Sequence, residues 1–360
     1  MGQRRSGLFC AAAVVLVIDL LVVAVHTDDG VARGSEVAAA KARAASLPMV
    51  DADSPLPRPL LEETTTTTAP TTTEPPTTTA PPPPPAPPVQ TRGDSWTVGP
   101  YRGTGVWIDV YDWTSTITNG RPTVGPAQVD QMAAFGIQTI YIQTAHRRSP
   151  ADVLDPELLL PIIERAHLHG IAVVAWYLPE LIDTTYDLNK VLAAARLPVD
   201  GVGIDIESRA VGDVNERNRR LIELSEGMRR NLGSMAMSAI TLDAVHLQAV
   251  NPSFWPAFPW PELGRLYDVI VPMAYWSGRK SEWRSGDRYT AENIERIRAA
   301  TGRPDMPIHI AGGIADGISL DDVAGMVHAI HMRGAIGGSL YDWNTSHGAQ
   351  WDLLRALRVG

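Results

Sequence analysis

Short apolar runs alternate with longer amphipathic segments from about residue 97 to the end of the chain. The runs are typical of buried strands, and the segments, with apolar residues every three or four positions, are typical of helices that cover a sheet. Strands are predicted at residues 105–110, 138–143, 172–177, 201–206, 235–241, 268–274, 307–311 and 336–341. Helices are predicted at residues 126–135, 156–169, 186–195, 214–232, 291–301, 320–333 and 350–357.

This alternation predicts an α/β fold, because parallel strands are joined by crossover helices. Residues 97–360 form one domain, close in length to the roughly 250 residues of a (β/α)8 TIM barrel. The exception follows the fifth strand, where residues 251–263 read NPSFWPAFPWPEL. The prolines of this stretch argue against a regular helix.

A different composition precedes the barrel. Residues 7–25 are almost wholly apolar and follow Arg4 and Arg5, which predicts a membrane-targeting segment within residues 1–30 with its N-terminus in the cytoplasm. An uncleaved single-pass anchor is favoured over a cleaved signal peptide. The barrel is then expected on the extracytoplasmic side of the cell membrane, or secreted if the segment is cleaved.

Residues 31–96 form the second region. Residues 64–88 read TTTTTAPTTTEPPTTTAPPPPPAPP, a Thr/Pro-rich stretch with too few apolar residues to fold, so a disordered linker is predicted. At about 3.1 Å per residue in a polyproline II conformation, it would reach roughly 75 Å. A spacer of this length suits a domain that stands off a membrane.

Charge and motif content exclude several functions. The formal net charge is −9, and no Lys/Arg stripe is interleaved with aromatic residues, so nucleic-acid binding is not expected. The sequence has none of the HExxH, CxxC, GxSxG or phosphate-loop motifs, and neither a cofactor nor a metal is predicted. One alternative stays open, in which Asp109, Asp205 and Glu207 hold a hard cation.

Asp205 and Glu207 carry the strongest chemical signal. They end the predicted fourth strand, DGVGIDIE, and residues two apart on a strand point the same way. Two carboxylates on one face repel each other, so one of them is driven to keep its proton near neutral pH. This arrangement predicts a general acid at the carboxyl ends of the strands, where TIM barrels place their active sites.

Aromatic residues share the predicted catalytic face with these acids. Carboxylates interleaved with aromatic rings are typical of a carbohydrate cleft. The predicted substrate-binding residues are Asp109, Trp113, Trp176, Trp276 and Trp343. Two roles stay open for the aromatic residues of the loop at 251–263, which either stack on sugar rings or cap the core.

The fourth-strand motif resembles the DxxDxDxE signature of the chitinase-like glycoside hydrolases of family 18. Met273-Ala274-Tyr275 is similar to the Met-x-Tyr that ends their sixth strand. The resemblance implies that Glu207 is the proton donor, that Asp205 holds the substrate's N-acetyl group for attack on the anomeric carbon, and that Tyr275 supports the same group. Gly203 departs from the signature, because it replaces the middle aspartate.

A second, partial resemblance concerns strands one and four. Residues 108–113, IDVYDW, are similar to the opening strand of the family 25 lysozymes, which also carry Asp-x-Glu on strand four. This resemblance would add Asp109 to the site and make peptidoglycan the substrate.

The strand-seven sequence HIAGGIAD lacks the Glu that an ordinary retaining glycosidase commonly places there, which favours substrate assistance or loss of catalysis. The predicted function is therefore cleavage of an N-acetylated amino-sugar polymer, peptidoglycan or chitin-like. The alternatives are a non-catalytic carbohydrate-binding barrel and an envelope scaffold.

Overall fold

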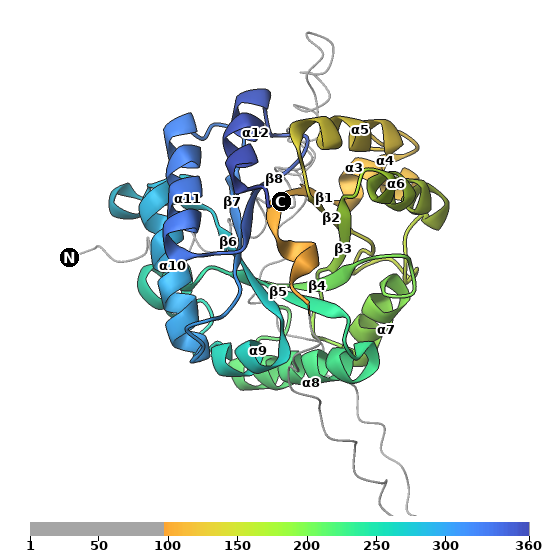
Figure 1. Ribbon diagram of the computed structural model, residues 1–360. Coiled ribbons are helices and arrows are strands. Elements are labelled where there is room, and N and C mark those ends of the chain that lie inside the picture. The colour runs from red at the N-terminus through yellow and green to blue at the C-terminus, as the bar shows by residue number, and fades with distance from the viewer. Residues whose placement is uncertain (1–96, 360) are drawn as a thin grey trace, which may run out of the picture. The chain divides into compact units, whose positions relative to one another are not determined.

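Eight parallel strands form a closed barrel in the computed structural model, which describes residues 97–359 (Figure 1). Each strand pairs with the next in sequence, and β1 closes the barrel against β8. The strands are β1 Gly103–Ile108, β2 Thr139–Gln143, β3 Ala172–Tyr177, β4 Gly201–Ile206, β5 Ala236–Leu242, β6 Val269–Ala274, β7 His309–Ile314 and β8 Gly337–Tyr341. The predicted barrel is confirmed, with its largest boundary error at the end of β7.

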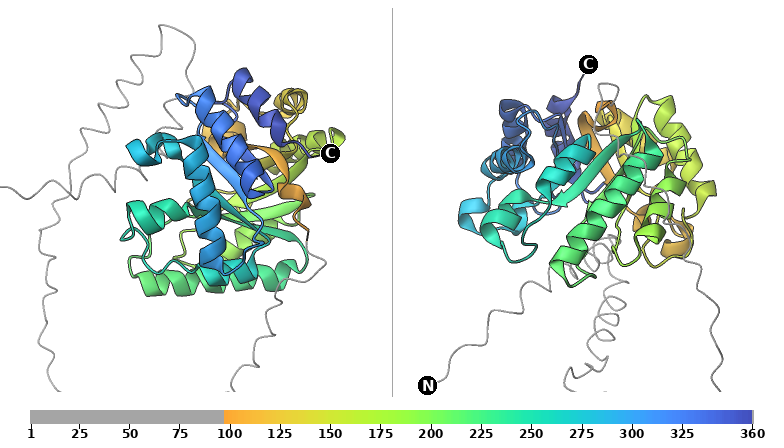
Figure 2. Two further views of the ribbon diagram at one scale, coloured as in Figure 1. Left: turned by 60° about the vertical axis from the view of Figure 1, so that its left-hand side comes forward. Right: turned by 90° about the horizontal axis from the view of Figure 1, so that it is seen from below.

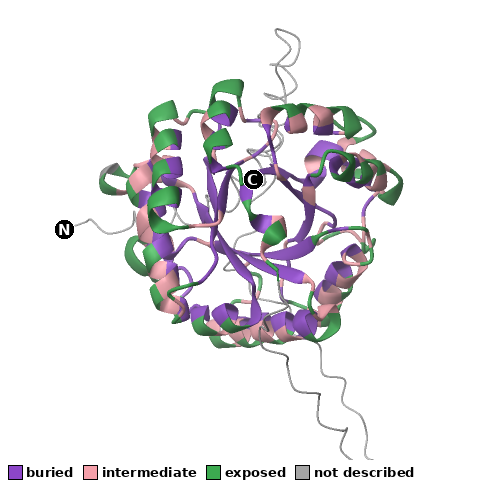
Figure 3. Ribbon diagram, viewed as in Figure 1, coloured by how far each residue is buried: buried purple, intermediate pink, exposed green. Residues whose placement is uncertain are grey.

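Helices surround the barrel in every view (Figure 2). They include α5 Pro126–Phe135, α6 Pro156–Leu168, α7 Thr184–Ala194, α8 Val214–Leu232, α10 Gly286–Thr301, α11 Leu320–Arg333 and α12 Gly348–Leu354. Their exposed faces point away from the buried strands (Figure 3). Short helices occupy the loops at α3 Val110–Trp113, α4 Ser115–Thr118 and α9 Trp260–Leu266.

Helix α9 corrects the interpretation of residues 251–263. Irregular backbone covers only the first part of this stretch, and α9 begins at Trp260. Pro261 lies in its first turn, where a missing N–H breaks no intrahelical hydrogen bond. The prolines therefore delay the helix without preventing it.

The core has two layers. The outer layer lies between strands and helices and includes the outward residues of β4, Val202, Ile204 and Ile206. The inner layer fills the barrel with aromatic side chains, which include Tyr101, Trp107, Tyr141 and Trp176. Alternate residues of each strand face the barrel interior. The last inward-facing residue of each strand therefore lies at the predicted catalytic face.

Close packing of aromatic rings seals the barrel interior. Trp107 stacks on Tyr141 with ring centroids 4.4 Å apart, and a Cβ at Gly105 would lie 2.8 Å from the Tyr141 ring. The Tyr101 hydroxyl donates to the carbonyl oxygens of Val202 and Ala236 at 2.8 and 3.1 Å. A substrate is therefore expected at the carboxyl ends of the strands and not within the barrel.

The predicted membrane segment and linker fall within residues 1–96, outside the described residues. Between residues 97 and 359, no helix combines the length and the apolar character needed to cross a membrane.

Candidate active site

Asp205 lies at the carboxyl end of β4, on the strand face that points into the barrel. Gly203, two residues earlier, faces the inner residues Ser238 and Ile240, and side chains two apart share a face. Asp205 is 8% exposed, whereas Glu207, just after the strand, is half-buried. The two predicted acids therefore emerge from the barrel at its carboxyl end, with Asp205 the deeper of the two.

The environment of Asp205 disfavours its charged form. Burial raises the pKa of Asp205 well above its ordinary value, and the charge of Glu207 raises it further. The guanidinium of Arg147, in the loop after β2, opposes both effects. Asp205 Oδ1 is buried and has no hydrogen-bond partner among the described residues. Such an atom is costly to bury, so a ligand that donates to it would gain binding energy.

Tyr275 belongs to the same group of side chains. It follows β6, and burial raises the pKa of its hydroxyl well above the ordinary value, with further contributions from the charges of Asp205, Glu207 and Asp342. Its ring centroid lies 6.4 Å from that of Tyr341. The predicted catalytic residues are thus electrostatic neighbours at one end of the barrel.

Asp109 anchors a second acidic cluster beside them. It caps α3 by accepting from the Tyr111 backbone N–H at 2.7 Å, and the Tyr341 hydroxyl donates to its Oδ2 at 2.8 Å. Burial raises the pKa of Asp109 well above its ordinary value, and the charges of Asp112 and Asp342 add to the effect. Tyr341 thus connects Asp109 to Tyr275 through its hydroxyl and its ring.

Three buried carboxylates in this cluster have the geometry of a possible cation site. Asp109, Asp112 and Asp342 each offer an oxygen, and these oxygens lie within 4.8 Å of one another. Hydrogen-bond donors already reach all three, from Tyr341 to Asp109, from Asn344 to Asp112 and from the Thr345 backbone to Asp342. In the described part of the chain this set differs from the predicted one, because neither Asp205 nor Glu207 belongs to it.

The predicted tryptophans do not line an open cleft in this conformation. Trp113 and Trp276 are 0% and 1% exposed and belong to the outer core, and the Trp113 indole donates to the Gln143 carbonyl at 2.9 Å. Trp176 lies in the inner core. Trp343 is half-buried and packs on Phe135 and Trp351. Of the predicted binding residues, Asp109 is the one whose carboxylate joins the group of acids around Tyr275.

The aromatic loop caps the core, which resolves the choice left open by the sequence. Phe254, Trp255, Phe258 and Trp260 are all at least 90% buried. Arg209 is the basic residue nearest to Glu207 in sequence. Its guanidinium carbon lies 4.6 Å from the centroid of the Phe254 ring. Arg209 is therefore stacked on this loop.

Gly203 occupies a position where a larger side chain does not fit. A Cβ there would lie 2.5 Å from Ser238 Oγ and 3.1 Å from Ile240 Cδ1. Ser238 therefore fills the space that an aspartate at position 203 would need.

Tyr341 ends the predicted eighth strand and Asp342 follows it, but neither was assigned a role from the sequence, and Arg147 was not identified. Their position at the carboxyl end of β8 was the available signal for the first two residues. Arg147 had none, because its approach to Asp205 depends on the path of the loop after β2.

No family model and no curated protein matches the sequence. Solved structures match the barrel. The spore cortex-lytic enzyme SleL of Bacillus megaterium is 10% identical over 71% of this chain and 74% of its own, with a TM-score of 0.51. The PgaB (BpsB) glycoside hydrolase domain of Bordetella bronchiseptica is 13% identical over 72% of this chain and 100% of its own, with a TM-score of 0.53.

Thermotoga maritima endoglucanase Cel5A is 14% identical over 72% of this chain and 98% of its own, with a TM-score of 0.50. The names of these neighbours cover different substrates, so the shared architecture does not by itself identify a polymer. The protein therefore has a (β/α)8 barrel fold in common with glycoside hydrolases.

Proposed function

We propose that this protein is an extracytoplasmic glycoside hydrolase that cleaves an N-acetylated amino-sugar polymer, peptidoglycan or chitin-like, with assistance from the substrate. The observation that carries the proposal is the buried, unpartnered Oδ1 of Asp205 beside Glu207 and Tyr275. An acetamido N–H supplies the donor that this oxygen lacks; a sugar hydroxyl can also donate to it, but only the acetamido group adds a carbonyl oxygen that can attack the anomeric carbon.

Each residue has a distinct role in the proposed reaction. Because Asp205 and Glu207 repel each other, the pair favours sharing one proton, which in the reactive form is on Glu207 while Asp205 is ionised. Glu207 gives that proton to the glycosidic oxygen while the bond to the anomeric carbon breaks. The acetamido carbonyl oxygen of the same sugar forms the new bond to that carbon, and Asp205 accepts the acetamido N–H. Tyr275, whose raised pKa keeps it protonated, donates to the acetamido group.

Water completes the cycle. Glu207, now ionised, takes a proton from a water molecule, and the water oxygen attacks the anomeric carbon and displaces the acetamido oxygen. No protein nucleophile is needed. This is consistent with β7, His309–Ile314, which contributes no carboxylate, and with the substrate-assisted exceptions among glycosidases.

Two of the structural neighbours carry names that fit the proposal. One is a spore cortex-lytic enzyme and another a PgaB glycoside hydrolase domain. The apolar segment at residues 7–25 and the Thr/Pro-rich linker at residues 64–88 support a location at the outer face of the cell membrane, with the polymer as partner.

Matched oligosaccharides test the requirement for the acetamido group. Purified protein should release reducing ends from N-acetylchitohexaose or soluble peptidoglycan, and should leave cellohexaose and fully deacetylated chitosan hexamer intact. Chitosan carries amines in place of acetamides, so it isolates the assisting group. Equal cleavage of the acetylated and deacetylated hexamers would refute substrate assistance.

Gly203 favours a second candidate, a barrel that binds the same polymer without cleaving it. No side chain at position 203 can share the proton of Asp205, and Ser238 occupies the space beside it. This candidate predicts binding of N-acetylchitohexaose by calorimetry with no product after prolonged incubation.

A further inference from the structure

A pocket of about 150 Å³ lies beside the candidate active site, at the carboxyl end of β3. The loop after β2 contributes Arg147, the loop after β3 contributes Glu180 and Ile182, and the start of α7 contributes Tyr186. Tyr177, the last residue of β3, is 2% exposed and also lines the pocket. None of these residues belongs to the reaction proposed above.

Arg147 joins this pocket to the catalytic pair. Its Nε lies 3.2 Å from Glu180 Oε1 in an ion pair, and the charge of its guanidinium also lowers the pKa of Asp205. Electrostatic effects of this kind need proximity, and β3 pairs with β4 so that Tyr177 lies opposite Ile204. The pocket and Asp205 therefore lie at the ends of neighbouring strands, with Arg147 close to both. A polymer held at Asp205 would thus pass close to the pocket.

The chemistry of the pocket favours a neutral, hydroxyl-rich ring. Three carboxylates line it against one guanidinium, which disfavours anions. Asp183 and Asp187 are engaged by the Thr185 N–H and the Tyr177 hydroxyl at 2.9 and 2.8 Å. The side chain of Glu180 is 33% exposed. A carboxylate has about four acceptor sites, so Glu180 can accept sugar hydroxyls while it pairs with Arg147.

An apolar surface faces the same space. Ile182 is 58% exposed, although burial of a large aliphatic side chain is worth roughly 1.5–3 kcal/mol. Together with the half-buried ring of Tyr186 it offers the apolar contact that one face of a pyranose requires. The volume is below the roughly 300–1,000 Å³ of sites for drug-sized ligands, so the pocket suits one ring.

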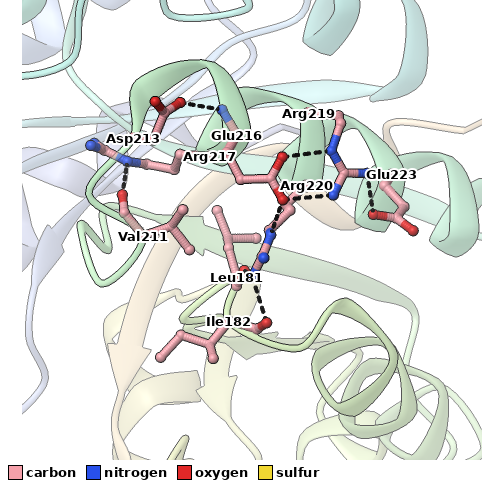
Figure 4. Close-up of polar contacts among 9 residues, drawn as sticks. All are labelled: Leu181, Ile182, Val211, Asp213, Glu216, Arg217, Arg219, Arg220 and Glu223. Carbon is pink, nitrogen blue, oxygen red and sulfur yellow. Dashed lines mark hydrogen bonds and ion pairs between the residues drawn. The ribbon is translucent and has the colours of Figure 1, made fainter.

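The loop that carries Ile182 is held in place before any ligand arrives. Arg220 of α8 donates from Nη1 to the carbonyl oxygens of Leu181 and Ile182 at 3.0 and 2.6 Å (Figure 4). Glu216 accepts from Arg220 and Arg219, and these bonds lower the pKa of Glu216 to about 2. The Glu216–Arg220 pair that anchors the loop therefore stays charged across the whole pH range of an enzyme assay. Because the loop is already ordered, ligand binding needs little further ordering of it.

We propose that this pocket is an additional sugar subsite that binds one unit of the amino-sugar polymer away from the cleaved bond, with Ile182 and Glu180 as its contacts. The inference rests on the proposed function. It predicts that longer oligomers gain affinity from the pocket, whereas a two-unit substrate that occupies only the catalytic centre does not.

The test fills the pocket without disturbing its anchor. In Ile182→Trp the side chain blocks the cavity, while the backbone carbonyl that accepts from Arg220 is retained. Leu168→Trp is the matched control, because Leu168 is 76% exposed at the end of α6, at the opposite face of the barrel. kcat/KM is measured for N-acetylchitooligosaccharides of two to six units, and the affinity for N-acetylchitohexaose and a six-sugar peptidoglycan fragment by calorimetry.

Ile182→Trp should lower the ratio of kcat/KM for six units to that for two units about tenfold, through KM, and Leu168→Trp should not. Glu180→Gln should lower it in the same direction, since a hydrogen bond to a charged group is worth about tenfold or more. An unchanged ratio in an active enzyme overturns the subsite and leaves the proposed function standing. If the wild type binds without cleaving, weaker binding by Ile182→Trp alone supports the subsite while the hydrolase proposal fails. Absence of hexamer binding by the wild type overturns the subsite.

Discussion

His309 offers a test of the sealed barrel interior that supports the site. Its imidazole is completely buried, with Nδ1 2.9 Å from the Tyr101 carbonyl oxygen and Nε2 3.0 Å from Ser339 Oγ. A carbonyl can only accept, so Nδ1 carries the proton and Nε2 accepts from Ser339. The Trp107 indole donates to the same Ser339 oxygen at 2.8 Å. The network is therefore satisfied by a neutral His309.

Acidification should destabilise the fold through this residue. Burial lowers the pKa of His309 from 6.5 to about 4, although the bond to Tyr101 opposes the effect. Since the unfolded chain takes up the proton first, stability is lost as pH falls from 6.5 toward 4. The full loss is about 3 kcal/mol, of which about 2.5 kcal/mol is reached near pH 4.5.

Urea unfolding followed by tryptophan fluorescence measures this loss. Wild type and His309→Gln are compared near pH 7 and pH 4.5, and the wild type should lose about 2–3 kcal/mol more than the variant. Other titrating groups are common to both proteins and cancel in the difference. Equal acid sensitivity of the two proteins would refute the assignment of a neutral, buried His309.

Three further changes probe the site and its scaffold. The raised pKa of Asp205 makes the stability of the wild type fall as pH rises from about 4. Asp205→Asn should therefore have a higher melting temperature than the wild type near pH 8, but not near pH 3. A lower melting temperature of the variant near pH 8 would contradict this. Arg229→Met leaves Asp268, its fully buried partner at 2.8 Å, without a counter-charge and should cost about 3–5 kcal/mol in urea unfolding, so a cost well below that range would count against a dry ion pair. Gly203→Ala should cost about 1–3 kcal/mol by overpacking, and Ser238→Ala in the same chain should recover most of it, whereas additive costs would show that Ser238 is not the obstacle.

Periodicity predicted the barrel well wherever chemistry also marks the ends of an element. The range of β4 agrees in full with its prediction, as does that of α8, which Asp213 caps through the Glu216 N–H. The end of β7 was missed, because its pairing with β8 shifts register between Gly312 and Ile314. Neither apolar spacing nor turn residues reveal such a shift.

The positions of the acidic residues of the candidate site were predictable from the sequence, whereas the burial of its tryptophans was not. Strand alternation and the shared carboxyl end place Asp205 and Glu207 together from sequence alone. The burial of Trp113 depends on a tertiary bond to the Gln143 carbonyl, and that of Trp276 on packing beside Gly312 of the next strand. Contacts between loops of different βα units decide these details, and a single sequence does not encode them locally.

The catalytic roles of the strand-four pair remain predictions, and Glu207→Gln tests them most directly. Reducing-end release from N-acetylchitohexaose and soluble peptidoglycan is compared between wild type and variant, with melting temperature and hexamer affinity as controls. The amide keeps the shape of Glu207 but cannot give up a proton, so turnover should fall roughly 100- to 10,000-fold while folding and binding persist. Equal release of reducing ends by the two proteins would contradict the assignment of Glu207 as the general acid.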